Sequence, residues 1–231
     1  MLANPRKNKA LYNKRMVVNS LWKMQHKKCC YCEQLIPEDG HLKAVDHFKP
    51  KSIFKRLTNN WDNLLLACSQ CNGKKSNRFP YELCNNKDEA KVVWVTKDNK
   101  NKSLLSKGKY LVINPSDSKT FPEAHFDYVL DDNDDLLGLI KHNSKLGQFT
   151  IEVIGLADSF HTKGRRLQYF NLYRAYLVIL EAKDLDDQQT LSINLNTFSL
   201  LLHPGSRYAG FARAFARANN LEDRFGVKIP S

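Results

Sequence analysis

The sequence lacks any apolar stretch that approaches the roughly 18–20 residues required by a membrane-spanning helix, and it shows no internal repeat or low-complexity tract. Its first residues are basic, but they lack the apolar core and the small-residue cleavage site of a secretion signal. The apolar content of 42% is that of an ordinary globular protein. We therefore expect a cytoplasmic globular protein without a membrane segment, whose thiols are kept reduced.

Acidic residues are absent from residues 1–28, which carry eight lysines and arginines, and residues 49–78 hold seven such cations against Asp62 alone. The formal net charge is +12, and many of the acids gather at 117–135. Lysine and arginine gain Coulomb energy near phosphates and release counterions there, so the basic segments favour a nucleic acid as partner. Solvated surface is the ordinary alternative, but the basic segments flank the cysteine-rich region and the acidic one does not.

Apolar periodicity divides the chain into short strands followed by helices. The predicted elements are a helix at 9–25, strands at 92–95 and 110–113, a hairpin with an acidic turn at 125–141, and helices from 147 onward. Two helical stripes are interpreted as core packing. They consist of Leu167, Phe170, Tyr173, Leu177 and Leu180, and of Phe211, Ala214, Phe215 and Ala218.

Four of the six cysteines form two CxxC pairs, Cys29 with Cys32 and Cys68 with Cys71. Two such turns complete a four-thiolate zinc site with no open position. Redox motifs or disulfides are the alternatives, and neither suits a cytosolic chain without a thioredoxin-like pattern. The pairs are 35 residues apart, more than the about 15–20 residues of a standard double knuckle. The loop between them is therefore expected to carry other functional residues.

Two cysteines remain outside these pairs. Cys30 could replace Cys29 as a ligand only with an awkward one-residue spacing, so we do not favour it. Cys84 is expected to pack as a small apolar residue.

The loop carries Asp46 directly before His47, then Asn63, and Asn72 follows the second pair. A carboxylate and an amide oxygen can hold a hard divalent cation, and a histidine can take a proton from an attacking water. Neighbouring residues of a regular strand point to opposite faces. Asp46 and His47 can share one site only at a strand end or distortion, and Pro50 is a plausible place for the strand to stop.

The order CxxC, Asp-His, Asn, CxxC-Asn, Lys resembles that of the HNH endonucleases, whose ββα-metal motif is commonly stapled by two cysteine knuckles. The resemblance implies that His47 is the general base and that Asp46 and Asn72 are the ligands of a catalytic metal. Asn63 would brace the loop that holds the histidine. Asn72 stands where the final H of the motif is expected, and an amide ligand suits Mg²⁺ or Mn²⁺ better than zinc.

Lysines and arginines surround the motif on both sides. By the same resemblance Lys75 would face the phosphate of the substrate. Lys49, Lys51, Lys74 and Arg78 are expected to bind substrate with it as a set, and solvated surface is the alternative for each member.

A looser resemblance covers most of the chain. The segments "LVINPSDS", "HFDYVLDDND" and "TIEVIGLADSFHTKGRR" follow the motif in the order seen in the PtuB-type HNH nucleases of bacterial anti-phage Septu systems, which also occur beside retrons. This resemblance implies a partner ATPase of the ABC or SMC type and, where a retron is present, a reverse transcriptase with its RNA and DNA.

We predict an α+β fold with a ββα-metal core stapled by a four-cysteine zinc site. The predicted divisions, packed as one unit, are a basic helix at 1–28, the nuclease core at 29–90, short strands and a hairpin at 91–145, and a helical region at 146–231. The predicted function is metal-dependent hydrolysis of phosphodiester bonds in anti-phage defence. The alternative is a zinc-knuckle module that binds nucleic acid or protein without catalysis.

Overall fold

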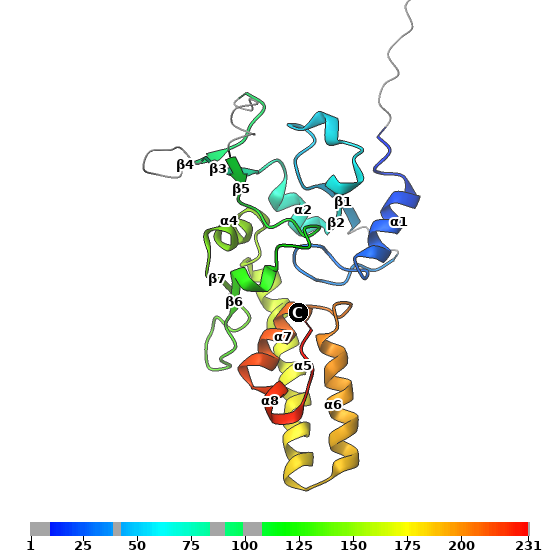
Figure 1. Ribbon diagram of the computed structural model, residues 1–231, viewed down its shortest axis with the longest axis vertical. Helices are drawn as coiled ribbons and strands as arrows, with labels where there is room; N and C mark the ends of the chain where they lie inside the picture. Colours follow the sequence, from blue (N-terminus) through cyan, green and yellow to red (C-terminus); the bar gives the residue numbers. More distant parts are fainter. Residues whose placement is uncertain (1–9, 39–42, 84–90, 99–107, 231) are drawn as a thin grey trace, which may run out of the picture.

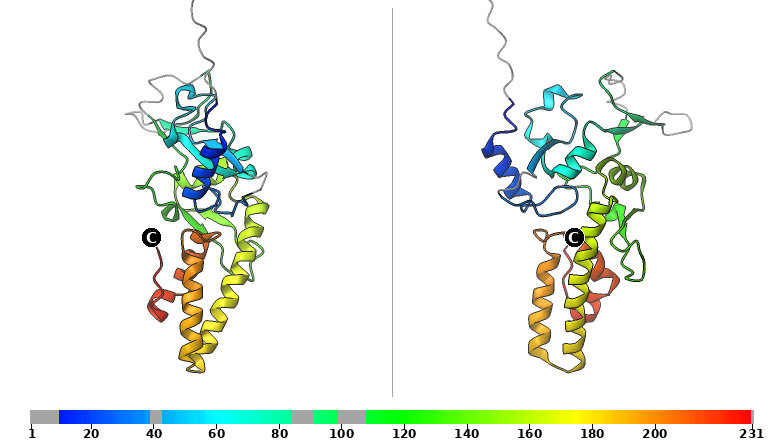
Figure 2. Two further views of the ribbon diagram at one scale, coloured as in Figure 1. Left: turned by 90° about the vertical axis from the view of Figure 1, so that its right-hand side faces the viewer. Right: turned by 180° about the vertical axis from the view of Figure 1, so that it is seen from behind.

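The computed structural model describes residues 10–38, 43–83, 91–98 and 108–230, and it confirms the α+β fold (Figure 1). The molecule is elongated. Small sheets and short helices lie at one end, and the long helices α5 and α6 form a hairpin that extends from the other (Figures 1 and 2). Cys84 lies outside the described residues. None of the helices in the described part is long and apolar enough to cross a membrane.

A ββα unit forms the centre of the sheet-containing end. β1 (Lys43–His47) pairs antiparallel with β2 (Leu64–Cys68), so that His47 lies opposite Leu64. All five residues of β2 are buried, because its apolar run packs on both faces. α2 (Ser69–Lys75) follows directly, and the Cys68 sulfur caps its first turn. His47 is the last residue of β1, as the strand-end prediction required.

Two further pieces of sheet accompany this unit. β3 (Pro80–Leu83) pairs with both β4 (Lys91–Trp94) and β5 (Gly108–Tyr110). The predicted strand at 110–113 is therefore wrong beyond its first residue. Its apolar residues are buried in a loop instead, because the Ile113 amide donates to the Thr150 hydroxyl at 2.9 Å rather than to a strand.

The predicted hairpin is confirmed. β6 (Phe126–Tyr128) pairs antiparallel with β7 (Ile140–His142). The described residues at this end also form three short 3₁₀ helices: η1 (Lys55–Leu57), η2 (Trp61–Asn63) and η3 (Pro122–His125).

The helices after the hairpin are α4 (Lys145–Ile154), α5 (Ser159–Asp184), α6 (Gln188–Leu202), α7 (Ala209–Ala218) and α8 (Leu221–Phe225). A hydrophobic core around Leu172 and Phe215 holds the long helices together, and a second core surrounds the ββα unit. The predicted burial of Phe211 and Phe215 is confirmed.

The other predicted stripe is wrong, since Leu167, Phe170 and Leu177 are 57%, 45% and 45% exposed. The buried face of α5 is formed by Tyr169, Leu172, Tyr176 and Ile179. α5 carries apolar residues on two faces, and α6 and α7 cover only one of them.

The N-terminal helix is shorter than predicted. α1 (Arg15–Met24) begins after Leu11, which is exposed. Trp22 is buried in the helix and donates its indole N–H to the Ile36 carbonyl at 2.7 Å. α1 packs against β2 and so covers one side of the ββα unit.

Candidate active site and metal centre

The four predicted cysteines converge. The sulfur atoms of Cys29, Cys32, Cys68 and Cys71 all lie within 4.8 Å of one another, and each residue is buried. The Cys32 and Cys68 sulfurs are 3.8 Å apart, much farther than the about 2.05 Å of a disulfide. Four buried soft donors with no open side fit a structural zinc ion. Within the described ranges, no other group of three or more histidine, cysteine or acidic side chains has this arrangement.

Cys30 is not a member of this cluster. Burial raises the pKa of its thiol well above the ordinary value, and the neighbouring Cys29 adds to the effect. The structure thus places Cys29, and not Cys30, among the four converging sulfurs.

A histidine that the sequence did not single out lies against the cluster. His161, in the first turn of α5, places Nε2 3.5 Å from the Cys71 sulfur. It is buried, and its Nδ1 has no hydrogen-bond partner. The two residues are 90 positions apart, so no local spacing could have indicated the contact.

The backbone fixes the protonation pattern of His47. Its Nε2 lies 2.9 Å from the Thr58 carbonyl oxygen. Because a carbonyl only accepts, Nε2 carries the hydrogen and Nδ1 is the nitrogen able to take a proton. Burial is the main cause that lowers the pKa of His47 below its ordinary value, and Lys51 contributes in the same direction. The imidazole is therefore neutral near pH 7, as a general base requires.

Asn63 joins the two ends of the loop between β1 and β2. Its Oδ1 accepts from the Lys49 amide at 2.8 Å. Its Nδ2 donates to the Lys49 carbonyl at 3.0 Å and to the Leu57 carbonyl at 3.3 Å. The side chain is buried, and these three bonds make it a brace for the loop that follows His47.

Asp46, His47 and Asn72 line one open hollow of about 280 Å³, together with Lys51 and Asn77. The strand-end position of His47 therefore brings it to the same hollow as Asp46. A carboxylate with an amide oxygen is a donor set for a hard cation that keeps most of its waters. The residues present fit Mg²⁺ or Mn²⁺ better than zinc, because no thiolate lines the hollow.

The structure corrects the expected role of Lys75. Its side chain is completely buried, and Nζ lies 3.0 Å from both carboxylate oxygens of Asp46 and 2.8 Å from the His47 carbonyl oxygen. A group enclosed in this way cannot face a substrate phosphate. Asp46 has a second partner, since the Tyr31 hydroxyl donates to its Oδ2 at 2.6 Å.

The other lysines and the arginine that were predicted to bind substrate do not cluster at one place. Lys51 lines the hollow, and Lys49 lies over the Tyr110 ring. Lys74 pairs with Asp158 at 2.9 Å, and Arg78 with Glu152 at 3.0 Å. These two pairs are solvent-exposed, so they are weak and can exchange for a polyanion.

Tyr12 is a second residue near the candidate site that the sequence did not indicate. Its ring meets the His47 ring edge to face at a centroid distance of 4.6 Å. The Lys51 ammonium lies 4.3 Å from the centroid of the same tyrosine and donates to its hydroxyl. The segment before α1 therefore covers one side of the candidate base.

Residues 29–78 match the family model described as HNH endonuclease. This segment, with its ββα unit and cysteine cluster, is an HNH endonuclease domain. The chain is also similar to Septu proteins. It is 39% identical over 66 residues to Septu protein PtuB of Bacillus thuringiensis and 29% identical over 159 residues to Septu protein PtuB of Bacillus mycoides (strain KBAB4). It is 34% identical over 140 residues to Septu protein PtuA of the same B. mycoides strain.

These alignments cover 29%, 63% and 56% of this chain and 26%, 48% and 17% of the respective relatives. The chain thus spans less than half the length of each of these proteins. Their names contain no reference to a retron, and the expected retron partner stays a prediction.

Proposed function

We propose that the chain is a metal-dependent endonuclease that hydrolyses nucleic-acid phosphodiester bonds in anti-phage defence. The observation that carries the proposal is the hollow lined by Asp46, His47 and Asn72 inside an HNH domain. His47 is neutral, has a fixed tautomer and is braced through its loop by Asn63. Each predicted catalytic residue thus has a position that suits its role.

In this proposal His47 accepts at Nδ1 the proton of the water that attacks the phosphate. The Thr58 carbonyl holds the other ring nitrogen and stabilises the imidazolium that forms. Asp46 and Asn72 would hold the catalytic Mg²⁺ or Mn²⁺, which supplies charge stabilisation at the phosphate and the leaving oxygen. Cys29, Cys32, Cys68 and Cys71 would hold a structural Zn²⁺ that fastens the ββα unit.

The substrate is proposed to be DNA or RNA. Lys51 lines the hollow, and Lys49 lies on the same loop with its head over an aromatic ring. A net charge of +12 favours a polyanion. Lys74 and Arg78 would join the contact by exchanging their exposed carboxylate partners for phosphates.

We further propose that the nuclease acts in the cytoplasm with an ATPase of the ABC or SMC type. The similarity to proteins named PtuA and PtuB supports a Septu-like system. The segment similar to this chain makes up only 17% of the PtuA relative. In that relative, a segment similar to this chain is therefore part of a much longer protein. This arrangement is consistent with a nuclease that works beside a large partner.

The test measures cleavage of plasmid DNA and of total tRNA with Mg²⁺ or Mn²⁺, by the wild type, by His47→Ala and by His142→Ala. His142 is exposed on β7 and serves as the matched control. Cleavage by the wild type and His142→Ala but not by His47→Ala supports the proposal. Equal cleavage by all three assigns the activity to another site. If none cuts with or without the ATPase yet all bind nucleic acid, the chain is a binding module.

A further inference from the structure

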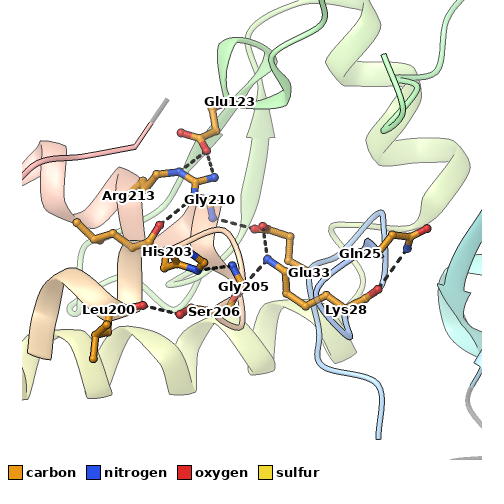
Figure 3. Close-up of polar contacts among 11 residues, drawn as sticks. Gln25, Lys28, Glu33, Glu123, Leu200, His203, Gly205, Ser206, Gly210 and Arg213 are labelled. Carbon is orange, nitrogen blue, oxygen red and sulfur yellow. Dashed lines mark hydrogen bonds and ion pairs between the residues drawn. The ribbon is translucent and has the colours of Figure 1, made fainter. Parts of the chain in front are cut away.

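The first cysteine knuckle contacts both the candidate active site and the helical region. We define this knuckle as residues 28–33, which carry Cys29 and Cys32. In its middle, Tyr31 donates to Asp46 Oδ2 at 2.6 Å. At its end, Glu33 Oε2 accepts from the Gly210 amide at the start of α7 at 2.8 Å (Figure 3). One short segment, fixed in place by two cysteines of the cluster, thus touches two separate parts of the molecule.

The contacts of Glu33 and Lys28 form a latch between the knuckle and the helical region. The Glu33 carboxylate also accepts from Lys28 Nζ at 3.0 Å, and its carbonyl accepts from the Tyr208 amide at 3.2 Å. Lys28 Nζ donates in addition to the Ser206 carbonyl at 3.0 Å (Figure 3). Glu33 has a φ of 61°, a left-handed conformation that is unfavourable for a non-glycine residue. These contacts offset that cost and hold the knuckle against the loop before α7.

Among the described residues, Tyr31 is the only hydrogen-bond or ion-pair partner of the Asp46 carboxylate that comes from outside the ββα unit. A carboxylate offers about four lone-pair sites. Two contacts from Lys75 and one from Tyr31 use three of them and leave one for a cation. A cavity of about 210 Å³ adjoins Tyr31 and Glu33. Part of the knuckle therefore faces a cavity, and the contacts of Tyr31 and Glu33 hold it in addition to its two cysteines.

We propose that Tyr31 is a positioning residue for Asp46 and that the latch at Glu33 sets where Tyr31 stands. Tyr31 has this role only if Asp46 binds the catalytic metal, as the proposed function states. Its hydroxyl fixes the orientation of the carboxylate so that the remaining lone pair faces the hollow. Movement of the loop before α7 would release Glu33, shift the knuckle and weaken the hold on Asp46. A change in the helical region would in this way alter how Asp46 binds the metal.

The experiment measures Mn²⁺ binding to the zinc-loaded full chain by electron paramagnetic resonance of free Mn²⁺. The variants are Tyr31→Phe, which removes one hydroxyl, Glu33→Gln and the double variant. Loss of a residue that orients a metal ligand typically weakens metal affinity by about 10–100-fold, and we expect a loss in this range for Tyr31→Phe. Glu33→Gln should weaken binding less. The double variant should equal Tyr31→Phe, because Glu33 acts through Tyr31.

Glu123→Gln is the matched control. Glu123 pairs with Arg213 (Figure 3) and with Arg217 of α7. It lines the same cavity as the knuckle, but among the described residues no hydrogen bond or ion pair joins the Glu123 side chain to residues 28–33. Its loss should leave Mn²⁺ affinity unchanged, although it also removes contacts of the helical region. Reduced affinity in this variant would show that any disturbance of α7 has the same effect, and would overturn the role of the latch.

Asp46→Asn separates failure of this proposal from failure of the proposed function. If Asp46→Asn binds Mn²⁺ as tightly as the wild type, Asp46 is not a metal ligand and both proposals fall. If Asp46→Asn weakens binding and Tyr31→Phe does not, only the positioning role of Tyr31 is refuted. If the effects of Tyr31→Phe and Glu33→Gln multiply in the double variant, Glu33 does not act through Tyr31.

Discussion

Replacing Lys75 with methionine tests the buried ion pair beneath the candidate site. Methionine matches the length of the lysine stem but has no charge. The substitution leaves the Asp46 carboxylate, which is 5% exposed, with the Tyr31 hydroxyl as its remaining hydrogen-bond partner among the described residues. It also removes the donor to the His47 carbonyl. We therefore expect a large loss of stability in addition to any loss of activity.

The magnitude follows from the distance and the burial. Two unit charges 3.0 Å apart attract by about 5 kcal/mol at an effective dielectric constant of about 20. Removing one partner of a buried pair typically costs about 3–5 kcal/mol, because the other charge stays buried without compensation. Asp46→Asn alone should be costly for the same reason. The double variant Asp46→Asn/Lys75→Met buries no charge, so it should cost less than the sum of the two.

The assay is urea unfolding of the zinc-loaded protein, read as the shift in midpoint. Lys74→Met is the matched control, since Lys74 is the adjacent residue on α2 and its pair with Asp158 is 53% and 44% exposed. Exposed pairs contribute about 0–1 kcal/mol, so this variant should resemble the wild type. A Lys75→Met shift no larger than that of Lys74→Met would refute the reasoning. Strict additivity in the double variant would refute the coupling.

Three further predictions concern the metal cluster and the loop. The wild type should contain one zinc per chain by mass spectrometry, and Cys68→Ser should lose it together with the ββα fold, since four thiolates converge there; full zinc in the variant would contradict the assignment. His161→Ala should release zinc to a chelator about tenfold faster or more, because the cluster loses the donor beside Cys71; an unchanged half-time would argue against that hydrogen bond. Asn63→Ala should lower the cleavage rate by about 100-fold at saturating metal, because the loop after His47 loses three hydrogen bonds. A rate close to that of the wild type would show that the loop holds without its brace.

The cysteine cluster could be predicted because the information in each CxxC pair is local, whereas the ββα unit was predicted from the resemblance to HNH endonucleases. A CxxC pair already places two thiols on one turn, and the strand-end argument for Asp46 and His47 needs only the alternation of side chains. Asn63 was predicted as a brace by resemblance alone, and its three hydrogen bonds show how it closes the loop. Residue type and spacing were sufficient for the cysteine cluster, whereas the brace and the ββα unit needed the resemblance.

Contacts between distant segments could not be predicted in this way. His161 reaches Cys71 across 90 positions, and Glu33 reaches Gly210 across 177. No sequence periodicity indicates either contact, because each depends on where α5 and α7 pack. The face of α5 was mispredicted for the same reason. Apolar residues occur on two of its sides, and only its neighbours decide that Leu172 is buried while Leu167 is exposed.

The adjacent pair Lys74 and Lys75 shows why charge alone did not identify substrate contacts. Successive residues of an α-helix point about 100° apart. Two neighbouring lysines on α2 therefore cannot both face the same site. Lys75 points to the end of β1 and is buried against Asp46, and Lys74 points to Asp158 at the start of α5. The acid at the end of β1 therefore determines which lysine is buried, because an unpaired carboxylate there would be costly. The same short helix thus carries one lysine that holds the candidate metal ligand and one that stays available to a polyanion.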